Sequence, residues 1–175
     1  MKTKIIGISG PSGSGKSTIA AELAKLHNGK VISADRYFKN ELPDMISPDN
    51  GKMYTDRNSP DSIDYTRLLS GVKRASNSKK YKTIIVEGLL IFYVREIREL
   101  FDCKIFVTAE PETCLYRRII RNMSLFSQTP QSIGDYYLKC ARHREAKFCL
   151  PTIKYADYII DNDVAFTDSL DKINF

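Results

Sequence analysis

Short apolar runs alternate with amphipathic stretches along most of the chain. Helical periodicity between the runs predicts helices over Lys16–His27, Ser62–Ala75, Leu90–Leu100, Pro111–Met123 and Ser132–Phe148, with a last turn near Asp168–Ile173. The runs themselves are rich in Ile and Val and are predicted as strands at Lys4–Ser9, Lys30–Ser33, Thr83–Glu87, Lys104–Thr108 and Asp157–Asp161. Strands that are apolar on both faces and separated by helices indicate an α/β fold, with a parallel sheet covered by helices on each side.

Residues 43–60 break this alternation. They are rich in Pro, Asp, Asn and Gly, and the segment is too long for a plain connector. We therefore predict a functional loop here. The whole chain, residues 1–175, has the length of one domain.

Composition narrows the classes of protein to consider. Apolar residues make up 42% of the chain, and no run approaches the roughly 18 uncharged apolar residues of a membrane span. No secretory signal is recognisable at the start, so a cytoplasmic location is expected. The cysteines show neither a C-x-x-C pair nor a His partner at zinc spacing, which favours buried free thiols. They are Cys103, Cys114, Cys140 and Cys149.

The net charge of +6 raises the question of an anionic partner. No RNA-binding aromatic signature and no helix-turn-helix spacing accompany the basic residues, so we expect a phosphate pocket and neither a nucleic-acid nor a membrane partner. The sequence does not indicate an oligomeric state. The arginines that suggest the pocket lie on two consecutive predicted helices: Arg117, Arg118, Arg121, Arg142 and Arg144.

A glycine-rich loop joins the first predicted strand to the first predicted helix. Its sequence, GPSGSGKS, matches G-x-x-x-x-G-K-[ST], and the strand before it and the helix after it are the setting that a phosphate-binding loop requires. Glycines let main-chain amides surround phosphate oxygens, Lys16 reaches the β- and γ-phosphates, and the Ser17 hydroxyl can bind Mg²⁺. A turn that binds nothing is the alternative. The expected nucleotide-binding residues are Gly10, Ser12, Gly13, Ser14, Gly15, Lys16, Ser17 and Thr18.

Two carboxylates follow or end predicted strands. Asp35 comes directly after the second strand and Glu87 ends the third, so a parallel sheet would bring both beside the glycine-rich loop. Asp35 is a candidate general base, and with Ser17 and Glu87 it is a candidate ligand of Mg²⁺. The alternative for each carboxylate is a helix cap.

A nucleoside triphosphate and Mg²⁺ at this loop do not identify the phosphate acceptor, which could be water or an organic hydroxyl. The N-K-x-D stretch with which GTPases bind guanine is absent from the chain. A base, a second metal-binding carboxylate and a group of arginines are what a kinase needs, so we favour an organic hydroxyl.

The helix predicted over Pro111–Met123 has two different faces. Arg117, Arg118 and Arg121 lie on one side, where they would neutralise a transferring phosphate or form a solvated surface. For Arg142, His143 and Arg144 the choice is between lid contacts and plain surface. The opposite face of the helix over Pro111–Met123 is predicted to be apolar and to pack on the core. Tyr136 and Tyr137 are also predicted as core residues. That apolar face consists of Leu115, Tyr116, Ile119, Ile120 and Met123.

These motifs resemble the uridine kinase branch of the P-loop kinases, whose relatives are the nicotinamide riboside kinases and phosphoribulokinases. The likeness extends over IIGISGPSGSGKST, VISADRYF, NSPDSIDYTRLL, IIVEGLLIF, CKIFVTAEPETCLYRRIIRNM and FCLPTIKYADYIID. It implies a five-stranded P-loop fold with a short helical lid at about residues 122–131, an acceptor segment at about 36–75, and transfer from ATP to the 5′-hydroxyl of a ribose-like acceptor. In this likeness Lys16 and Ser17 bind phosphate and metal, Asp35 is the base and Glu87 the second carboxylate. Arg118 matches a substrate arginine, and Arg117 and Arg121 are expected at the nucleotide.

The chain also departs from uridine kinases. The interval SGVKRASNSKKYK has no room for their pyrimidine-binding hairpin, and the lid stretch SLFSQTPQ has no arginine. Asn58 replaces their ribose-binding aspartate, and Tyr54 or Asp56 could substitute for it. The acceptor is therefore a nucleoside-like compound or another small alcohol, such as nicotinamide riboside or a vitamin-like compound. A regulatory module that binds nucleotide without turnover is the third possibility.

Overall fold

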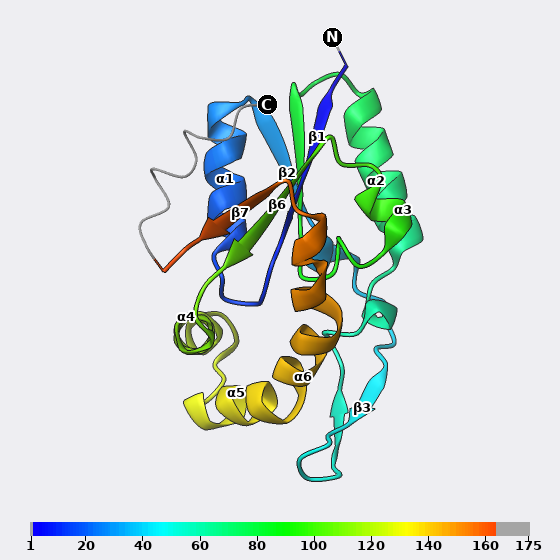
Figure 1. Ribbon diagram of the computed structural model, residues 1–175. Coiled ribbons are helices and arrows are strands. Elements are labelled where there is room, and N and C mark those ends of the chain that lie inside the picture. Colours follow the sequence, from blue (N-terminus) through cyan, green and yellow to red (C-terminus); the bar gives the residue numbers. More distant parts are fainter. Residues whose placement is uncertain (1, 164–175) are drawn as a thin grey trace.

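A five-stranded parallel sheet forms the centre of the protein, in the order β2-β5-β1-β6-β7 (Figure 1). The computed structural model describes residues 2–163, so the predicted turn near Asp168–Ile173 lies outside the described residues. All five predicted strands are confirmed to within one residue at each end. Their bounds are β1 Lys4–Ser9, β2 Gly29–Ser33, β5 Thr83–Glu87, β6 Cys103–Thr108 and β7 Tyr158–Asp161.

Helices cover both faces of this sheet (Figure 1). On one face, α1 (Lys16–Leu26) packs Leu23 into a cluster with the apolar residues of β1 and β6. On the other face, α2 (Tyr65–Asn77) contributes Val72 to a second cluster, and α3 (Arg95–Arg98) joins it. The predicted α/β class is therefore confirmed. The four cysteines are buried free thiols, as expected.

The helix predicted over Leu90–Leu100 is mostly wrong. Only Arg95–Arg98 is helical, and turns precede it. Leu90, Ile91 and Phe92 are 4%, 0% and 0% exposed, respectively. Successive residues of a helix point about 100° apart, so a helix with one face on the core does not bury three in a row. An irregular chain that enters the core explains this apolar run.

The segment 43–60, predicted as a loop, contains a β-hairpin. Strands β3 (Asp44–Ile46) and β4 (Met53–Thr55) pair antiparallel and form a separate two-stranded sheet. Gly51 adopts a φ of 66° in the connecting turn, which glycine tolerates well. The turn-forming residues were recognised in the sequence, but the short strands around them were not.

The remaining helices lie beyond the carboxyl ends of the strands, as the lower part of Figure 1 shows. Helix α4 (Pro111–Phe126) is followed by α5 (Pro130–Tyr136), which continues without a break to Tyr155 through α6 (Arg142–Arg144). We call residues 130–155 the C-terminal helical stretch. Residues 122–131, predicted as a short helical lid, comprise the end of α4, a loop and the start of α5.

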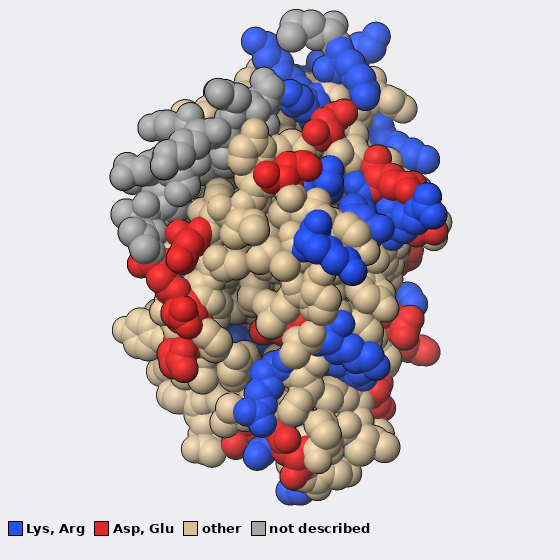
Figure 2. Space-filling view, viewed as in Figure 1, with Lys and Arg blue, Asp and Glu red and all other residues tan. Residues whose placement is uncertain are grey.

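Charge is dispersed on the face seen in Figure 2. Lys and Arg lie there in separate groups, with acidic side chains between them. Within residues 2–163, no helix has the length and apolar character needed to cross a membrane.

Candidate functional site

The carboxyl ends of the parallel strands bring the candidate residues to one edge of the sheet. The glycine-rich loop follows β1, and Glu87 ends the neighbouring strand β5. Ser33, at the end of β2, pairs in register with Glu87, and Asp35 is two residues further along. Parallel sheets commonly bind ligands at this edge, where the strand order reverses around the central strand.

The glycine-rich loop is shaped by backbone conformations that favour glycine. Gly13 and Gly15 have φ values of 92° and 97°. A Cβ atom on Gly13 would lie 2.2 Å from the Cys114 carbonyl oxygen in α4, and one on Gly15 would lie 2.1 Å from Nδ2 of Asn162. The loop is thus held closely between α4 and the end of β7.

Helix α1 begins at the end of this loop with its first amides available to a ligand. Gly15 is the N-cap residue, and no side chain caps the helix. The amides and the positive end of the helix therefore favour an anion at this position. Lys16 is buried, and its Nζ donates to the Pro11 carbonyl oxygen at 2.7 Å, across the same loop.

Two side-chain oxygen atoms that could be ligands of Mg²⁺ lie side by side next to the loop. Ser17 Oγ donates to Glu87 Oε2 at 3.3 Å, and Glu87 is 6% exposed. Mg²⁺ prefers hard oxygen ligands and commonly uses one or two protein groups together with phosphate oxygens. These donors fit that requirement, and they explain why a carboxylate is tolerated at the end of an otherwise apolar strand.

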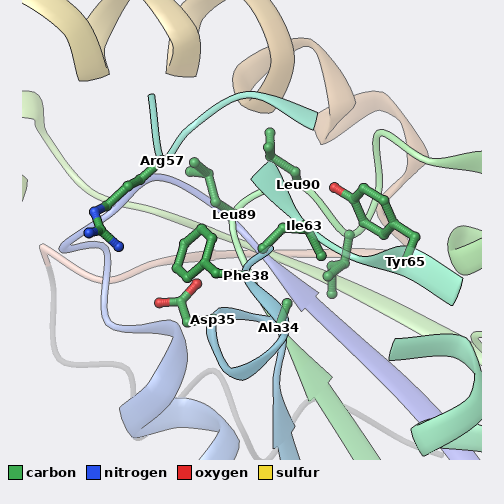
Figure 3. Close-up of a pocket in the computed structure, with 9 residues that line it drawn as sticks. Ala34, Asp35, Phe38, Arg57, Ile63, Tyr65, Leu89 and Leu90 are labelled. Atoms are coloured by element: carbon green, nitrogen blue, oxygen red, sulfur yellow. The ribbon is translucent and has the colours of Figure 1, made fainter. Parts of the chain in front are cut away.

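Asp35 is exposed and lines a small cleft together with residues from three other segments. It lies on a 3₁₀ turn, Ala34–Tyr37, and the cleft includes Phe38, Arg57 and Tyr65. In Figure 3, Asp35 and Arg57 both lie near the Phe38 ring at one end of the cleft, while Tyr65 lies at the other end. An exposed carboxylate at this position is free to accept a proton from a hydroxyl group.

Helix α4 is turned opposite to the expectation from its periodicity. Arg118 is 9% exposed, whereas Tyr116, Ile120 and Met123 are 66%, 53% and 43% exposed, respectively. The predicted apolar packing face, and Met123 as a core residue, are therefore wrong. Because α4 packs on the glycine-rich loop at Gly13, its inner face is the face that carries arginine.

Each of the three arginines on α4 has a different environment. Arg117 Nη2 donates to the Asn162 carbonyl oxygen at 2.9 Å. Arg121 Nη2 lies 3.5 Å from Ser12 Oγ, and burial, with the nearby Arg118 cation, lowers its pKa from the ordinary value. The carboxylates of Asp35 and Glu87 act in the opposite direction on Arg121, and they are too weak to cancel the lowering.

Arg118 has two buried nitrogen atoms without an acceptor among the described residues, whereas Arg117 has one, Nη1. The guanidinium carbon of Arg118 lies 5.4 Å from the centre of the Tyr136 ring. Its Nε and Nη1 atoms are buried and find no acceptor among the described residues. Buried donors are rarely left unpaired, so an anionic ligand is the expected partner.

The candidate acceptor-binding residues lie around Tyr136, which was predicted only as a core residue. Asn58 Nδ2 donates to Tyr136 Oη at 3.1 Å, and Tyr136 Oη donates to the Thr55 carbonyl oxygen at 3.1 Å. The rings of Tyr54 and Tyr136 are 6.5 Å apart. Tyr136 is half-buried, and burial raises its pKa above the usual range.

Asp56 has protein partners for both carboxylate oxygens. The main-chain N–H of Asn58 donates to Oδ1 at 2.8 Å, and Arg144 Nε donates to Oδ2 at 2.5 Å. The residue is fully buried. Its role as a substrate ligand stays a prediction, and the structure assigns it at least a structural ion pair.

Several residues at this edge were missed by the sequence analysis. Asn162 follows the last strand, and its Nδ2 donates to the Ser14 carbonyl oxygen at 2.8 Å; its position after a parallel strand was a usable signal. Glu145 accepts a hydrogen bond from the Ser12 amide at 3.2 Å. Nothing in the sequence distinguishes this glutamate from a surface residue of a helix. Arg57 stood in the segment predicted as a loop, without a pattern that singled it out.

Comparisons with known proteins agree with this geometry. A model of the phosphoribulokinase/uridine kinase family matches residues 72–165. A uridine kinase of Macrococcus caseolyticus (strain JCSC5402) is 31% identical over 98% of this chain and 96% of its own length. Uridine-cytidine kinase 2-B of Danio rerio is 29% identical over 92% of this chain and 75% of its own length.

A solved structure shares the fold at low sequence identity. It is that of a candidate fructose transport system kinase of Silicibacter sp. TM1040, with a TM-score of 0.63 and 14% identity over 90% of this chain and 89% of its own. This similarity supports the P-loop kinase fold and says nothing about the acceptor.

Proposed function

Because the chain belongs to the phosphoribulokinase/uridine kinase family, a family of ATP-dependent phosphotransferases, we propose that it transfers the γ-phosphoryl group of ATP to a hydroxyl group of a nucleoside or nucleoside-like acceptor. The observation that carries the proposal is the position of Asp35. It is an exposed carboxylate at the sheet edge, two residues after Ser33. Ser33 pairs in register with Glu87, and Glu87 contacts Ser17. A base, a metal-binding pair and a phosphate loop at one edge suit phosphoryl transfer.

In this mechanism Asp35 orients the acceptor hydroxyl and takes its proton. The acceptor oxygen forms a bond to the γ-phosphorus while the bond from that phosphorus to the bridging oxygen breaks, and ADP leaves. Lys16, Arg118 and Arg121 stabilise the charge on the transferring group. Mg²⁺ held by Ser17 and Glu87 would contribute further charge neutralisation.

The acceptor segment supports a nucleoside-like compound without defining it. Asn58 uses its amide nitrogen for Tyr136, so its carbonyl oxygen can accept from a ribose hydroxyl. A neutral amide binds a hydroxyl less strongly than the aspartate that uridine kinases carry at this position. Nicotinamide riboside or another small alcohol is thus retained beside uridine as a candidate acceptor.

The first test is ATP consumption with a panel of acceptors. We expect Mg²⁺-dependent ADP formation with at least one of uridine, cytidine, nicotinamide riboside and related small alcohols, with stoichiometric phosphorylation of the acceptor detected by mass spectrometry. ATP binding without turnover on any of these compounds would favour the regulatory module instead.

The second test addresses Asp35 directly. D35N should lower kcat by roughly 100-fold or more while changing the Kd for Mg-ATP by less than about threefold, because the residue acts on the acceptor proton. The matched control is E41Q, which neutralises another exposed carboxylate of the acceptor segment and should keep near-normal kcat. Equal losses of kcat and ATP affinity in D35N would show that Asp35 is only structural.

A further inference from the structure

One turn of the C-terminal helical stretch contacts both the phosphate loop and the acceptor segment. This turn, Arg142–Glu145, comprises α6 and the next residue. Arg142 and His143 contact Asp49 in the hairpin turn at 2.9 and 3.0 Å. Successive helix residues point about 100° apart, so one turn can contact structures on two sides. Glu145 contacts the phosphate loop, and Arg144 contacts the acceptor segment.

Glu145 connects the turn to the phosphate loop. Its carboxylate accepts from the Ser12 amide at 3.2 Å, and the residue is 5% exposed. Burial raises the pKa of this carboxyl, while the Arg118 and Lys16 cations and the Ser12 amide oppose that rise. Bound phosphate would compete with Glu145 for the same two cations. The environment of Glu145 must therefore change when a nucleotide binds.

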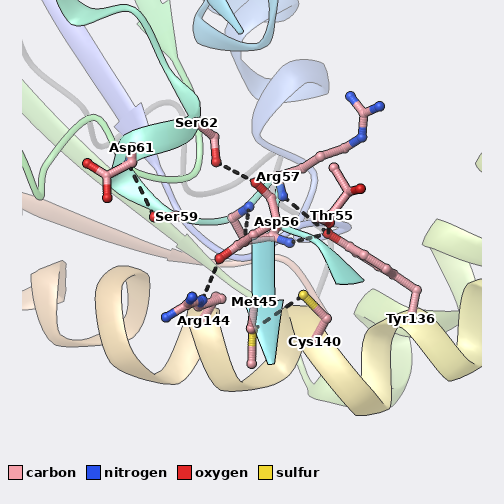
Figure 4. Close-up of polar contacts among 11 residues, drawn as sticks. Met45, Thr55, Asp56, Arg57, Ser59, Asp61, Ser62, Tyr136, Cys140 and Arg144 are labelled. Atoms are coloured by element: carbon pink, nitrogen blue, oxygen red, sulfur yellow. Dashed lines mark hydrogen bonds and ion pairs between the residues drawn. The ribbon is translucent and has the colours of Figure 1, made fainter. Parts of the chain in front are cut away.

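Arg144 connects the turn to the acceptor segment (Figure 4). It is paired with Asp56 Oδ2, and Asp56 Oδ1 accepts a hydrogen bond from the main-chain N–H of Asn58. Asp56 is fully buried, so separating it from Arg144 would leave an uncompensated charge in the interior. A movement of Arg144 should therefore carry Asp56 and Asn58 with it. Cys140 and Met45 add a sulfur contact at 3.5 Å between the helical stretch and the hairpin.

The surroundings of the turn leave room for such a movement. A cavity of about 450 Å³ lies beside it, lined by Pro11, Pro111, His143 and Glu145 among others. On both sides of α6 the helix widens into π-helical turns, Tyr137–Ala141 and Glu145–Cys149. Such turns occur frequently at functional sites within α-helices.

We propose that the turn Arg142–Glu145 couples nucleotide binding at the phosphate loop to the position of the hairpin and of Asn58, with Glu145 and Arg144 as positioning residues. This inference rests on the proposed function, because it requires a nucleotide at the phosphate loop. Through this coupling, ATP binding would change the position of the hairpin and of Asn58 before any acceptor is bound.

Hydrogen–deuterium exchange with and without Mg-AMP-PNP tests the coupling. The amides of Ser47, Gly51 and Asp56 are suitable reporters, because each is hydrogen-bonded to a main-chain oxygen within the acceptor segment. In the wild-type protein we expect the nucleotide to change their exchange rates by at least threefold. Affinity for Mg-AMP-PNP is measured separately by calorimetry.

Two sets of variants interrupt the turn at opposite ends. E145Q removes the charge at the phosphate loop and keeps an acceptor for the Ser12 amide, while R144M/D56N removes the buried pair without leaving a lone charge. R144M/D56N should bind Mg-AMP-PNP within threefold of wild type, whereas E145Q should bind it at least as tightly as wild type because the competing charge is gone. Both should lose most of the hairpin response. K147A, an exposed lysine on the same helical stretch, is the control and should respond like wild type.

The outcomes separate the coupling from the proposed function. Nucleotide binding without a hairpin response in the wild type, or a full response in either folded variant set, would overturn the coupling alone. Failure of the wild type to bind Mg-AMP-PNP would overturn the proposed function and the coupling with it. Because the two sets act at different ends, either one decides the question if the other does not fold.

Discussion

At the scale of single residues, Gly13 is a position of the phosphate loop that has no room for a side chain. A Cβ atom there meets the Cys114 carbonyl oxygen at 2.2 Å, and the backbone has a φ of 92°. G13A must shift the loop or α4, so we expect the Kd for Mg-ATP to rise by at least about tenfold, the equivalent of roughly 1.4 kcal/mol. Calorimetric titration of the variant with Mg-ATP measures the effect.

Gly134 provides the matched control for this substitution. It lies in α5, and a Cβ atom would meet nothing within 4 Å. G134A should bind Mg-ATP normally and gain about 0.5–1 kcal/mol in the free energy of unfolding, because alanine loses less backbone freedom in a helix. Normal ATP binding by G13A would contradict the close fit of the loop.

Local chemistry made some of the site residues predictable. Lys16 and Ser17 belong to a motif with fixed spacing, and Asp35 and Glu87 stand at strand ends that a parallel sheet must bring to one edge. Tyr136 could not be placed in this way. Its partners Thr55 and Asn58 lie about 80 residues earlier, and only tertiary packing brings them together.

At the scale of elements, α4 shows where periodicity fails as a guide. The inner strand β5 was predictable because its apolar run is buried on both faces. The edge strands β2 and β7 expose Val31 and Ile159, but their Ile and Val content still indicated strands. Helix α4 has a clear apolar face, but it packs on the phosphate loop instead of the main core. Arg118 on the inner face of this helix is buried, and a hydrophobic pattern does not predict a buried charge.

Arg118 and Ile120 allow the two faces of α4 to be distinguished by mutation. R118M should reduce kcat by roughly 100-fold or more, because buried donors without a protein acceptor are expected to stabilise the transferring phosphate. The same variant should lose little stability, because no hydrogen bond between Arg118 and the described residues is lost and Lys16 remains as a cation near the buried Glu145. Steady-state kinetics and chemical denaturation measure the two effects.

I120Q is the control on the opposite face of the helix. Ile120 is 53% exposed, so the change should alter the free energy of unfolding by no more than about 0.5 kcal/mol and leave kcat near its normal value. If I120Q unfolded the protein while R118M kept its activity, the orientation of α4 described above would be wrong.

At the scale of the whole molecule, the acceptor segment is held between the sheet and the C-terminal helical stretch. The hairpin forms its own small sheet and contacts the helical stretch through Asp49, Met45 and Thr55. None of these contacts joins neighbours in sequence, so sequence patterns recorded only a polar loop. The architecture of the central sheet could be predicted, whereas the attachment of the segment that is expected to hold the acceptor could not.

Asp49 makes this attachment sensitive to acid. Hydrogen bonds from His143 and from Arg142 lower the pKa of its carboxyl below the usual value of 3.8. A carboxyl with a lowered pKa in the folded state stabilises the protein fully above its unfolded pKa, and this contribution disappears as the pH falls through the folded pKa.

D49N should therefore have a lower Tm than wild type at pH 5–7, and the difference should vanish on acidification below the folded pKa. Thermal unfolding of both proteins from pH 7 down to strongly acidic conditions measures the difference, with D44N, a change of an exposed hairpin carboxylate, as the control that should match wild type throughout. If the deficit of D49N were the same under strongly acidic and neutral conditions, the loss would come from the backbone of the turn and the ionised carboxylate would not hold the hairpin.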